Sequence, residues 1–574
     1  MQQRAHLFSL RIAHALRESI NRNGYNSTKF GKDLLAGITV GIIAIPLAMA
    51  LAIACGVAPQ YGLYTAIIGG IVIAISGGSR YSISGPTAAF VVILYPIVQQ
   101  YGFGGLLLAT IMSGLILVIM AILRLGRFIE YIPEAVTLGF TAGIAVVIAT
   151  LQFNDILGLS IESLPEHDWD KLASSVTALP ELHLPSFTVA IFTLVIMLIW
   201  PKFKTVIPAH LPAVIFGSLF ALVLNNMGME IATIGSRFHY LLPDGSQGAG
   251  IPPYLPTFEW PWLQAGVNGQ ALVLSWTLLS DLLPAAFAIA MLGAIESLLC
   301  AVVLDGMTGK RHSANSELLG QGIGNIVVPF FGGITATAAI ARSAANVKAG
   351  AQTPISAVIH GLVVLASLVL FAPLFAYLPM PSMAVLLLVV AWNMSEAGKV
   401  LHLLKTAPKS DLWVFAICFS FTILFDMVLA ITAGILLAAV LFMKEIAEMV
   451  KVTDITNNKR IVAADIPADW RVFKINGPLF FAAADRVFSE LATKTTDVDG
   501  LVLYLEGVPL LDAGGLAAMD QFINQCKIYN TQVIFCDLQF QPLKTLARAG
   551  VQPIGGVTSF SPTLHEALRD IANY

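Results

Sequence analysis

Long apolar runs fill the first three quarters of the chain, and polar joints or Gly/Pro breaks separate them. A transmembrane helix needs about 20 apolar residues, and on this basis the sequence predicts roughly fourteen candidate spans, several of them too short to cross a membrane alone. The predicted spans are residues 34–54, 58–77, 86–101, 104–123, 131–151, 186–201, 208–228, 278–303, 318–331, 337–350, 355–373, 380–396, 411–425 and 427–446.

The pattern changes at about Lys451, where short β-branched stretches begin to alternate with amphipathic ones. This alternation predicts a small α/β domain, and its length of more than about a hundred residues is enough for a core of its own. The sequence therefore predicts an N-terminal segment over residues 1–32, a transmembrane domain over 33–450 and an α/β domain over 451–574.

Composition and charge placement agree with an integral membrane protein. Hydrophobic residues make up 57% of the chain and charged residues 12%, a balance that a water-soluble domain does not carry. Lysine and arginine gather in alternate joints, for example at Arg80, Lys202 and Lys310, while the long joints at 152–185 and 229–277 are acidic. Retention of basic joints in the cytoplasm predicts that both termini are cytoplasmic. The net charge of −3 gives no reason to expect a nucleic-acid partner.

Two stretches of small residues interrupt the apolar pattern at matching places in the two halves: SISGPTAAF (82–90) and GGITATAAIARS (332–343). Paired interrupted segments indicate an inverted repeat with discontinuous helices near the middle of the bilayer. The free N–H groups and the positive dipole end of each half-helix could bind an anion. Alternatively, the small residues only allow helices to pack closely. The candidate binding residues are Gly85, Pro86, Thr87, Thr337, Ala338, Ala339 and Ile340.

Two charged side chains fall inside apolar surroundings. Arg342 either attracts an anion or pairs with a carboxylate such as Glu296, since a guanidinium at bilayer depth faces a cavity or a partner. Glu296, in the run LGAIESLLCAVVLD, is a candidate for a coupling proton or cation site or for a charged partner of Arg342. In the first span Pro46 is expected to break or kink the helix, which leaves Leu47 and Leu51 as an apolar wall or as plain packing.

The sequence contains no arrangement typical of an enzyme. We find no nucleophile paired with a base and no cluster of metal ligands, and the five cysteines are scattered without metal or disulfide spacing. We therefore expect neither catalysis nor a cofactor.

The run PQYGLYTAIIGGIVIAISGGSR (59–80) resembles the signature of the SulP anion-transporter family. The resemblance continues through SISGPTAAF, NSELLGQGIGN (315–325) and FFGGITATAAIARSAAN (330–346), and the tail resembles a STAS domain. In detail the chain looks most similar to the bacterial C4-dicarboxylate transporters of this family.

The resemblance implies a seven-plus-seven inverted repeat of fourteen segments, divided into core and gate domains in a homodimer, with substrate between the starts of segments three and ten. A residue that can be threonine in sodium-coupled relatives is Cys300 here, which favours protons over sodium. In the STAS domain Ala513 stands where relatives carry a phosphorylatable residue after Asp512, so regulation by phosphorylation there is not expected. Docking, dimer contact, binding of a cytosolic protein partner, or simple support of folding and assembly are the roles left open for this domain. By position, the site of the family corresponds to Leu47, Leu51, Thr87, Glu296, Ala338, Ala339, Ile340 and Arg342.

The function expected from the sequence is import of C4-dicarboxylates, namely succinate, fumarate, malate or aspartate, across the bacterial inner membrane. The transporter would couple uptake to protons and alternate access between core and gate domains. A sulfate or bicarbonate transporter and an anion channel are the alternatives, and a receptor that senses anions is a third.

Overall fold

The computed structural model describes residues 10–22, 24–126, 132–159, 174, 177–203, 208–241, 246–267, 269–425, 427–462, 466–494 and 498–572. It divides into two compact units, Met1–Ile435 and Leu436–Tyr574, with the division inside helix α19 (Met427–Glu448). The predicted boundary between the transmembrane domain and the α/β domain, at residue 451, lies just after the end of that helix. It stays a prediction. Residues 1–9 of the expected N-terminal segment and 160–173 of the first long joint lie outside the described residues.

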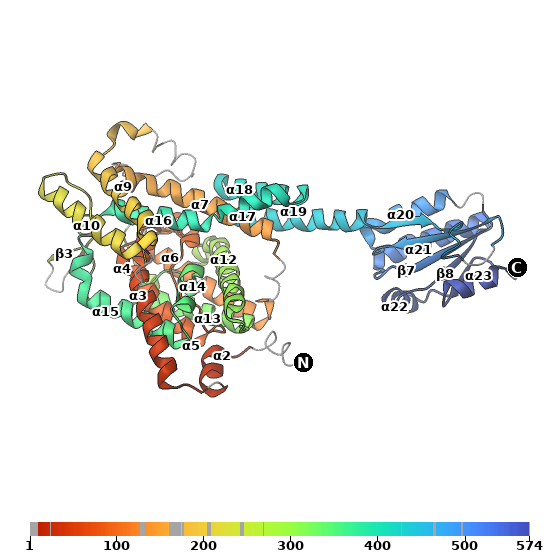
Figure 1. Cartoon of the computed structure of the whole chain (residues 1–574), viewed down its shortest axis with the longest axis horizontal. Helices are drawn as coiled ribbons and strands as arrows, with labels where there is room; N and C mark the ends of the chain where they lie inside the picture. The colour runs from red at the N-terminus through yellow and green to blue at the C-terminus, as the bar shows by residue number, and fades with distance from the viewer. Residues whose placement is uncertain are drawn as a thin grey trace. The chain divides into compact units, whose positions relative to one another are not determined.

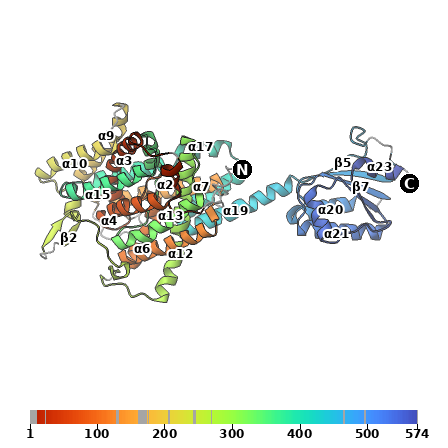
Figure 2. The same ribbon diagram turned by 90° about the horizontal axis from the view of Figure 1, so that it is seen from below.

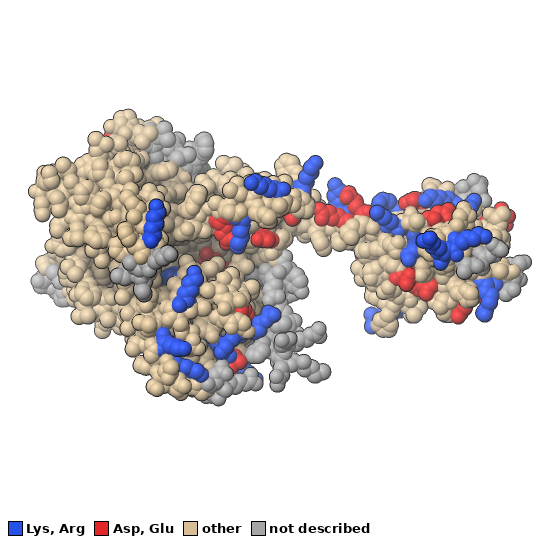
Figure 3. Space-filling model, in the orientation of Figure 1, with Lys and Arg blue, Asp and Glu red and all other residues tan. Residues whose placement is uncertain are grey.

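Apolar helices build unit 1 (Figure 1), and its surface in Figure 3 shows few charged side chains. Within the described residues, nine helices of the chain are long and apolar enough to cross a membrane. The helical membrane fold is confirmed, and the count of fourteen segments stays a prediction. The helices are α2 (His14–Arg17), α3 (Ser27–Ala54), α4 (Pro59–Tyr64), α5 (Gly70–Ser76), α6 (Val91–Ile122), α7 (Glu134–Leu157), α9 (Leu184–Ile199), α10 (His210–Asn226), α11 (Ile234–Arg237), α12 (Trp276–Thr308), α13 (Ala314–Val327), α14 (Ile340–Lys348), α15 (Ile355–Phe375), α16 (Met380–Met394), α17 (Ala397–Thr406) and α18 (Lys409–Leu424).

The way these helices pack fits an inverted repeat. Helix α3, the first of the first half, packs against α15, and α12, the first of the second half, packs against α6 (Figures 1 and 2). Helix α6 contains the expected break between spans three and four, because Gly102 has φ of 73° and ψ of −174°. Helix α15 follows the broken segment of the second half, and the part of α6 after Gly102 follows the broken segment of the first half. The first helix of each half therefore packs against the helix that follows the broken segment of the other half.

Glycines allow α3 and α15 to approach closely. A Cβ added at Gly37 would lie 2.6 Å from the carbonyl oxygen of Ser356, and one at Gly41 would lie 2.8 Å from Val363. Contacts this short leave no room for a methyl group.

Unit 2 is an α/β domain, as expected. Its five-stranded sheet has the order β5-β6-β7-β8-β9, with β5 antiparallel to β6 and the other neighbours parallel. Helices α20 and α21 bury their apolar side chains on one face of the sheet and α23 on the other. The first and last strands were not predicted, because both are short and outside the strongly apolar runs. The elements are β5 (Lys451–Asp454), β6 (Trp470–Asn476), α20 (Phe481–Thr493), β7 (Gly500–Gly507), α21 (Ala513–Tyr529), β8 (Gln532–Cys536), α22 (Phe540–Arg548), β9 (Thr558–Ser561) and α23 (Leu564–Ala572).

The close approach of α3 and α15 makes a direct prediction for Gly37→Ala. The extra methyl group should overpack the contact at a cost of roughly 1–3 kcal/mol, which a thermal melt of the purified protein in detergent will record as a lower melting temperature. Gly31→Ala is the matched control on the same helix, because no atom lies within 4 Å of the added Cβ. Equal melting temperatures for the two variants would contradict the close packing.

Candidate anion-binding site

The two broken segments meet as a short antiparallel ribbon. Strand β1 (Ser84–Gly85) pairs with β4 (Thr337–Ala338), with Ser84 opposite Ala338 and Gly85 opposite Thr337. All four residues are buried. The ribbon therefore joins two pieces of chain from opposite halves of the sequence, as the small-residue stretches predict.

A helix begins shortly after each strand. The 3₁₀ turn η4 (Ala88–Phe90) leads into α6, and α14 begins at Ile340. The residues before them, Thr87 and Ala339, have extended backbone, and neither gives its helix a side-chain cap. The first N–H groups of a helix have no partner within it, so both starts keep donors and positive potential for a ligand.

The helices begin later than the sequence predicts. The expected starts at residues 86 and 337 are wrong, because η4 begins at Ala88 and α14 at Ile340, after the ribbon of Ser84–Gly85 and Thr337–Ala338. Pro86 therefore lies before the helix and not in its first turn. Thr337 and Ala338 are strand residues, and the Thr337 hydroxyl donates to the Gly293 carbonyl oxygen at 3.2 Å.

The start of α14 is the accessible part of this arrangement. Ile340 is 40% exposed and its neighbour Ala341 is also exposed, whereas Thr87 is buried. Of the predicted residues, Ala339 and Ile340 therefore lie at an exposed helix start, and Thr87 lies at a buried one.

Arg342 reaches from α14 to the other half of the ribbon. Its side chain is 5% exposed, and Nη2 donates to the carbonyl oxygen of Pro86 at 2.5 Å. Nη1 has no partner among the described residues, and a Cβ added at Gly85 would lie 2.9 Å from it. A buried guanidinium with one free donor group is a strong anion ligand.

Glu296 does not form an ion pair with Arg342, which was one of the two alternatives for these residues. Within the described residues no ion pair joins the two side chains, and Glu296 is instead half-buried on α12, where its Oε2 accepts from the Thr87 hydroxyl at 2.9 Å. Thr87, next to the η4 start, therefore links the acidic residue to the ribbon. The role of Glu296 in proton coupling stays a prediction.

Leu47 and Leu51 lie on α3, which runs unbroken through Pro46 from Ser27 to Ala54. A break in the first span is thus wrong, and a kink at Pro46 stays a prediction. Leu51 is 5% exposed and belongs to the same apolar cluster as the η4 residues, with Leu47 packed against it. Their contact with a ligand stays a prediction.

Sequence reasoning missed the side chains that fix the ribbon. The Ser343 hydroxyl accepts from the N–H of Ile83 at 2.9 Å, and Asn346 Nδ2 donates to the carbonyl oxygen of Tyr81 at 3.0 Å. The available signal was the polar side of α14, where Arg342, Ser343 and Asn346 recur at helical spacing and are all buried.

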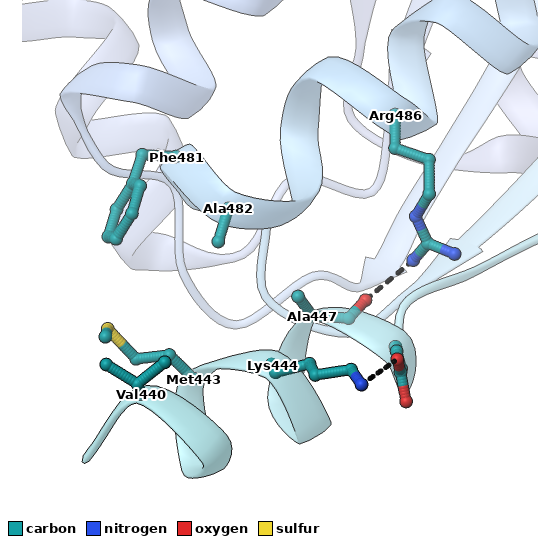
Figure 4. A pocket seen from close by; sticks show the side chains of 8 residues that line it. Val440, Met443, Lys444, Ala447, Phe481, Ala482 and Arg486 are labelled. Carbon is teal, nitrogen blue, oxygen red and sulfur yellow. Dashed lines mark hydrogen bonds and ion pairs between the residues drawn. The ribbon is translucent and has the colours of Figure 1, made fainter. Parts of the chain in front are cut away.

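Unit 2 contains a separate hollow of about 530 Å³ between the end of α19 and the start of α20 (Figure 4). Apolar side chains, including the exposed Phe481, form much of its lining. Arg486 donates to the carbonyl oxygen of Ala447 at 2.6 Å and so caps the end of α19. Elsewhere in the unit, Asp512 caps α21 by accepting from Gly515 N–H at 2.8 Å, and Ala513 begins that helix.

Comparisons of the sequence give consistent results. Residues 30–418 match the Sulfate permease family, and residues 461–567 match the STAS domain. The chain is 40% identical over 529 residues to the Bacillus subtilis protein named "Putative sulfate transporter YvdB", covering 92% of this chain and 95% of that protein. It is 26% identical over 532 residues to the bicarbonate transporter BicA of Picosynechococcus sp., covering 87% of each.

Comparisons of the structure agree with those of the sequence. The transmembrane domain of a cyanobacterial bicarbonate transporter BicA superposes with a TM-score of 0.60 at 26% identity, covering 72% of this chain and 98% of that one. The overall structure of SLC26A9 superposes with a TM-score of 0.82 at 15% identity, covering 100% of this chain and 94% of that one. The second likeness establishes the fold of the whole chain.

The closeness of Gly85 to Arg342 predicts the effect of Gly85→Ala. The new methyl group would displace the free Nη1 group, and we expect affinity for small oxyanions to fall about tenfold, which corresponds to about 1.4 kcal/mol. Titration calorimetry on the purified protein measures this. Gly293→Ala is a nearby control, since its added Cβ would lie 3.4 Å from Phe90 in ordinary contact. Unchanged affinity in Gly85→Ala would exclude the guanidinium from the site.

Proposed function

The chain belongs to the sulfate permease family of anion transporters and has a C-terminal STAS domain, and from this premise we propose that it is a secondary active transporter of small oxyanions. The observation that carries the proposal is the meeting of two uncapped helix starts beside the free Nη1 group of Arg342. It acts as a transporter and not as an enzyme, as its relatives do.

The anion would rest between the start of α14 and the start of η4. Each helix start contributes on the order of 0.3–2 kcal/mol toward a bound negative charge, and the guanidinium adds donors in surroundings that exclude water. The Leu51 side of the site is apolar, which strengthens these interactions because the effective dielectric is low.

Glu296 would carry the coupling proton. Its hydrogen bond with Thr87 connects it to the η4 helix start, so its charge acts on the place where the anion binds. A neutral Glu296 favours an anion nearby and an ionised one repels it, which links uptake to protonation. Cys300, one turn later and fully buried, offers no hydroxyl for sodium.

Sulfate is the first candidate substrate and bicarbonate the second, because the relatives reported above carry these names. The C4-dicarboxylates expected from the sequence have no support from those relatives and form a third candidate. We further propose alternating access between core and gate domains in a homodimer, with both termini in the cytoplasm of a bacterial cell. The hollow beside Phe481 in unit 2 is a candidate contact for a cytosolic protein partner.

Uptake by proteoliposomes tests the substrate proposal. We expect saturable uptake of radiolabelled sulfate that an inward proton gradient stimulates severalfold, with bicarbonate competing and succinate competing weakly. If sulfate is neither taken up nor competes, and succinate uptake saturates, the proposal of sulfate is wrong and the prediction of a dicarboxylate transporter is correct. Uptake of all anions that does not saturate would favour a channel and contradict a transporter.

Replacing the acidic residue tests the coupling proposal. Glu296→Gln fixes the side chain in a form like the protonated one, so sulfate uptake should lose its rise between pH 8 and pH 6 and become the same at both values within about twofold. Asp281→Asn, an exposed residue on the same helix, is the control and should keep the dependence. A Glu296→Gln protein with the pH profile of the unaltered protein would remove Glu296 from the coupling role.

A further inference from the structure

Helix α13 carries a line of buried polar side chains that the proposed site does not use. Glu317, Gln321 and Asn325 are spaced by four residues, so they lie on one face of the helix. Their exposures are 1%, 0% and 1%. Burying polar groups costs free energy unless each finds a hydrogen-bond partner. Their partners therefore show what this face of α13 holds.

Asn325 holds the chain that enters β4. Its Oδ1 accepts from the N–H of Ala336 at 2.8 Å, and its Nδ2 donates to the carbonyl oxygen of Ala336 at 2.9 Å. The side-chain amide thus makes the two hydrogen bonds to Ala336 that the backbone of a neighbouring strand would otherwise make. Ala339 N–H donates to the carbonyl oxygen of Ile83, on the β1 side, at 3.0 Å. Backbone groups of successive strand residues point to alternate sides, so the N–H and C=O groups of Ala336 point away from β1, toward α13. The β4 segment is therefore held on both edges.

Gln321, one turn earlier on α13, holds β1. Its Nε2 donates to the Ser84 hydroxyl at 3.2 Å and to Oε1 of Glu317 at 3.2 Å. Glu317 Oε2 in turn accepts from the N–H groups of Gly78 and Ser79 at 2.9 and 2.8 Å. These two residues belong to the chain that leads into β1. One face of α13 therefore contacts both broken segments.

We infer that Glu317, Gln321 and Asn325 are positioning residues that set the affinity for the anion. Strands of two residues are too short to hold their register alone, and the anion needs both helix starts at once. The α13 side chains fix the two segments before the anion arrives, so binding does not have to order them. This inference rests on the proposed function, because it concerns the same site.

Asn325→Ala tests the inference, with Asn225→Ala as a matched control. Asn225 on α10 makes the same pair of hydrogen bonds to the backbone of Ile231, at 2.6 and 3.2 Å, away from the ribbon. In sulfate uptake we expect Asn325→Ala to raise KM at least tenfold with Vmax within about twofold, and Asn225→Ala to leave KM unchanged. A rise in KM of equal size in both variants, or a fall only in Vmax in Asn325→Ala, would overturn the positioning role.

Hydrogen exchange supplies a readout that does not depend on transport. In ligand-free protein, Asn325→Ala should raise exchange at least tenfold in peptides spanning 82–87 and 334–341, and Asn225→Ala should change neither. Unchanged exchange in both peptides would contradict the inference, whereas a wild-type protein that carries no anion would contradict only the proposed function. If Asn325→Ala does not fold, Gln321→Met removes the bond to Ser84, and unchanged exchange over 82–87 in that variant would overturn the inference.

Discussion

The pairing of β1 with β4 is the contact on which the rest of unit 1 depends. An interrupted helix inside a membrane leaves backbone N–H and C=O groups without partners, and such groups are tolerated only where protein or a ligand satisfies them. The ribbon gives each broken segment partners from the other half of the chain, and side chains of α13 and α14 bind several of the groups that remain. Among the described residues, neither helix start has a side-chain cap, and Arg342 Nη1 has no partner.

On the proposed function, this distribution of hydrogen bonds would let an apolar protein attract an anion without a large basic surface. The positive potential comes from backbone dipoles and from one guanidinium, which Pro86 anchors through its carbonyl oxygen. Glu296 is the only acidic side chain hydrogen-bonded to Thr87 in the described part of the chain. In the proposed mechanism, a single protonation of Glu296 would change the net charge beside the helix starts and so link proton and anion movement.

The sequence predicts the parts of this site that depend on local pattern. Glycine and alanine runs marked both breaks, Arg342 and Glu296 stood out in apolar surroundings, and alternating strands and helices marked unit 2. It did not predict that the helices begin at Ala88 and Ile340, because those starts depend on a pairing between residues far apart in the chain. For the same reason the partner of Arg342 proved to be a backbone carbonyl of the other half and not Glu296. The contacts of α13 with both broken segments were not predicted, because a sequence motif gives the types of residue and not the contacts that they make across the fold.

A structure with a bound anion tests the central claim most directly. Cryo-electron microscopy of the purified protein in saturating sulfate should reveal density within hydrogen-bonding distance of the backbone N–H groups at the starts of both η4 and α14 and of Arg342 Nη1. Density for sulfate at another place in unit 1, with these N–H groups bonded to protein atoms, would contradict the account.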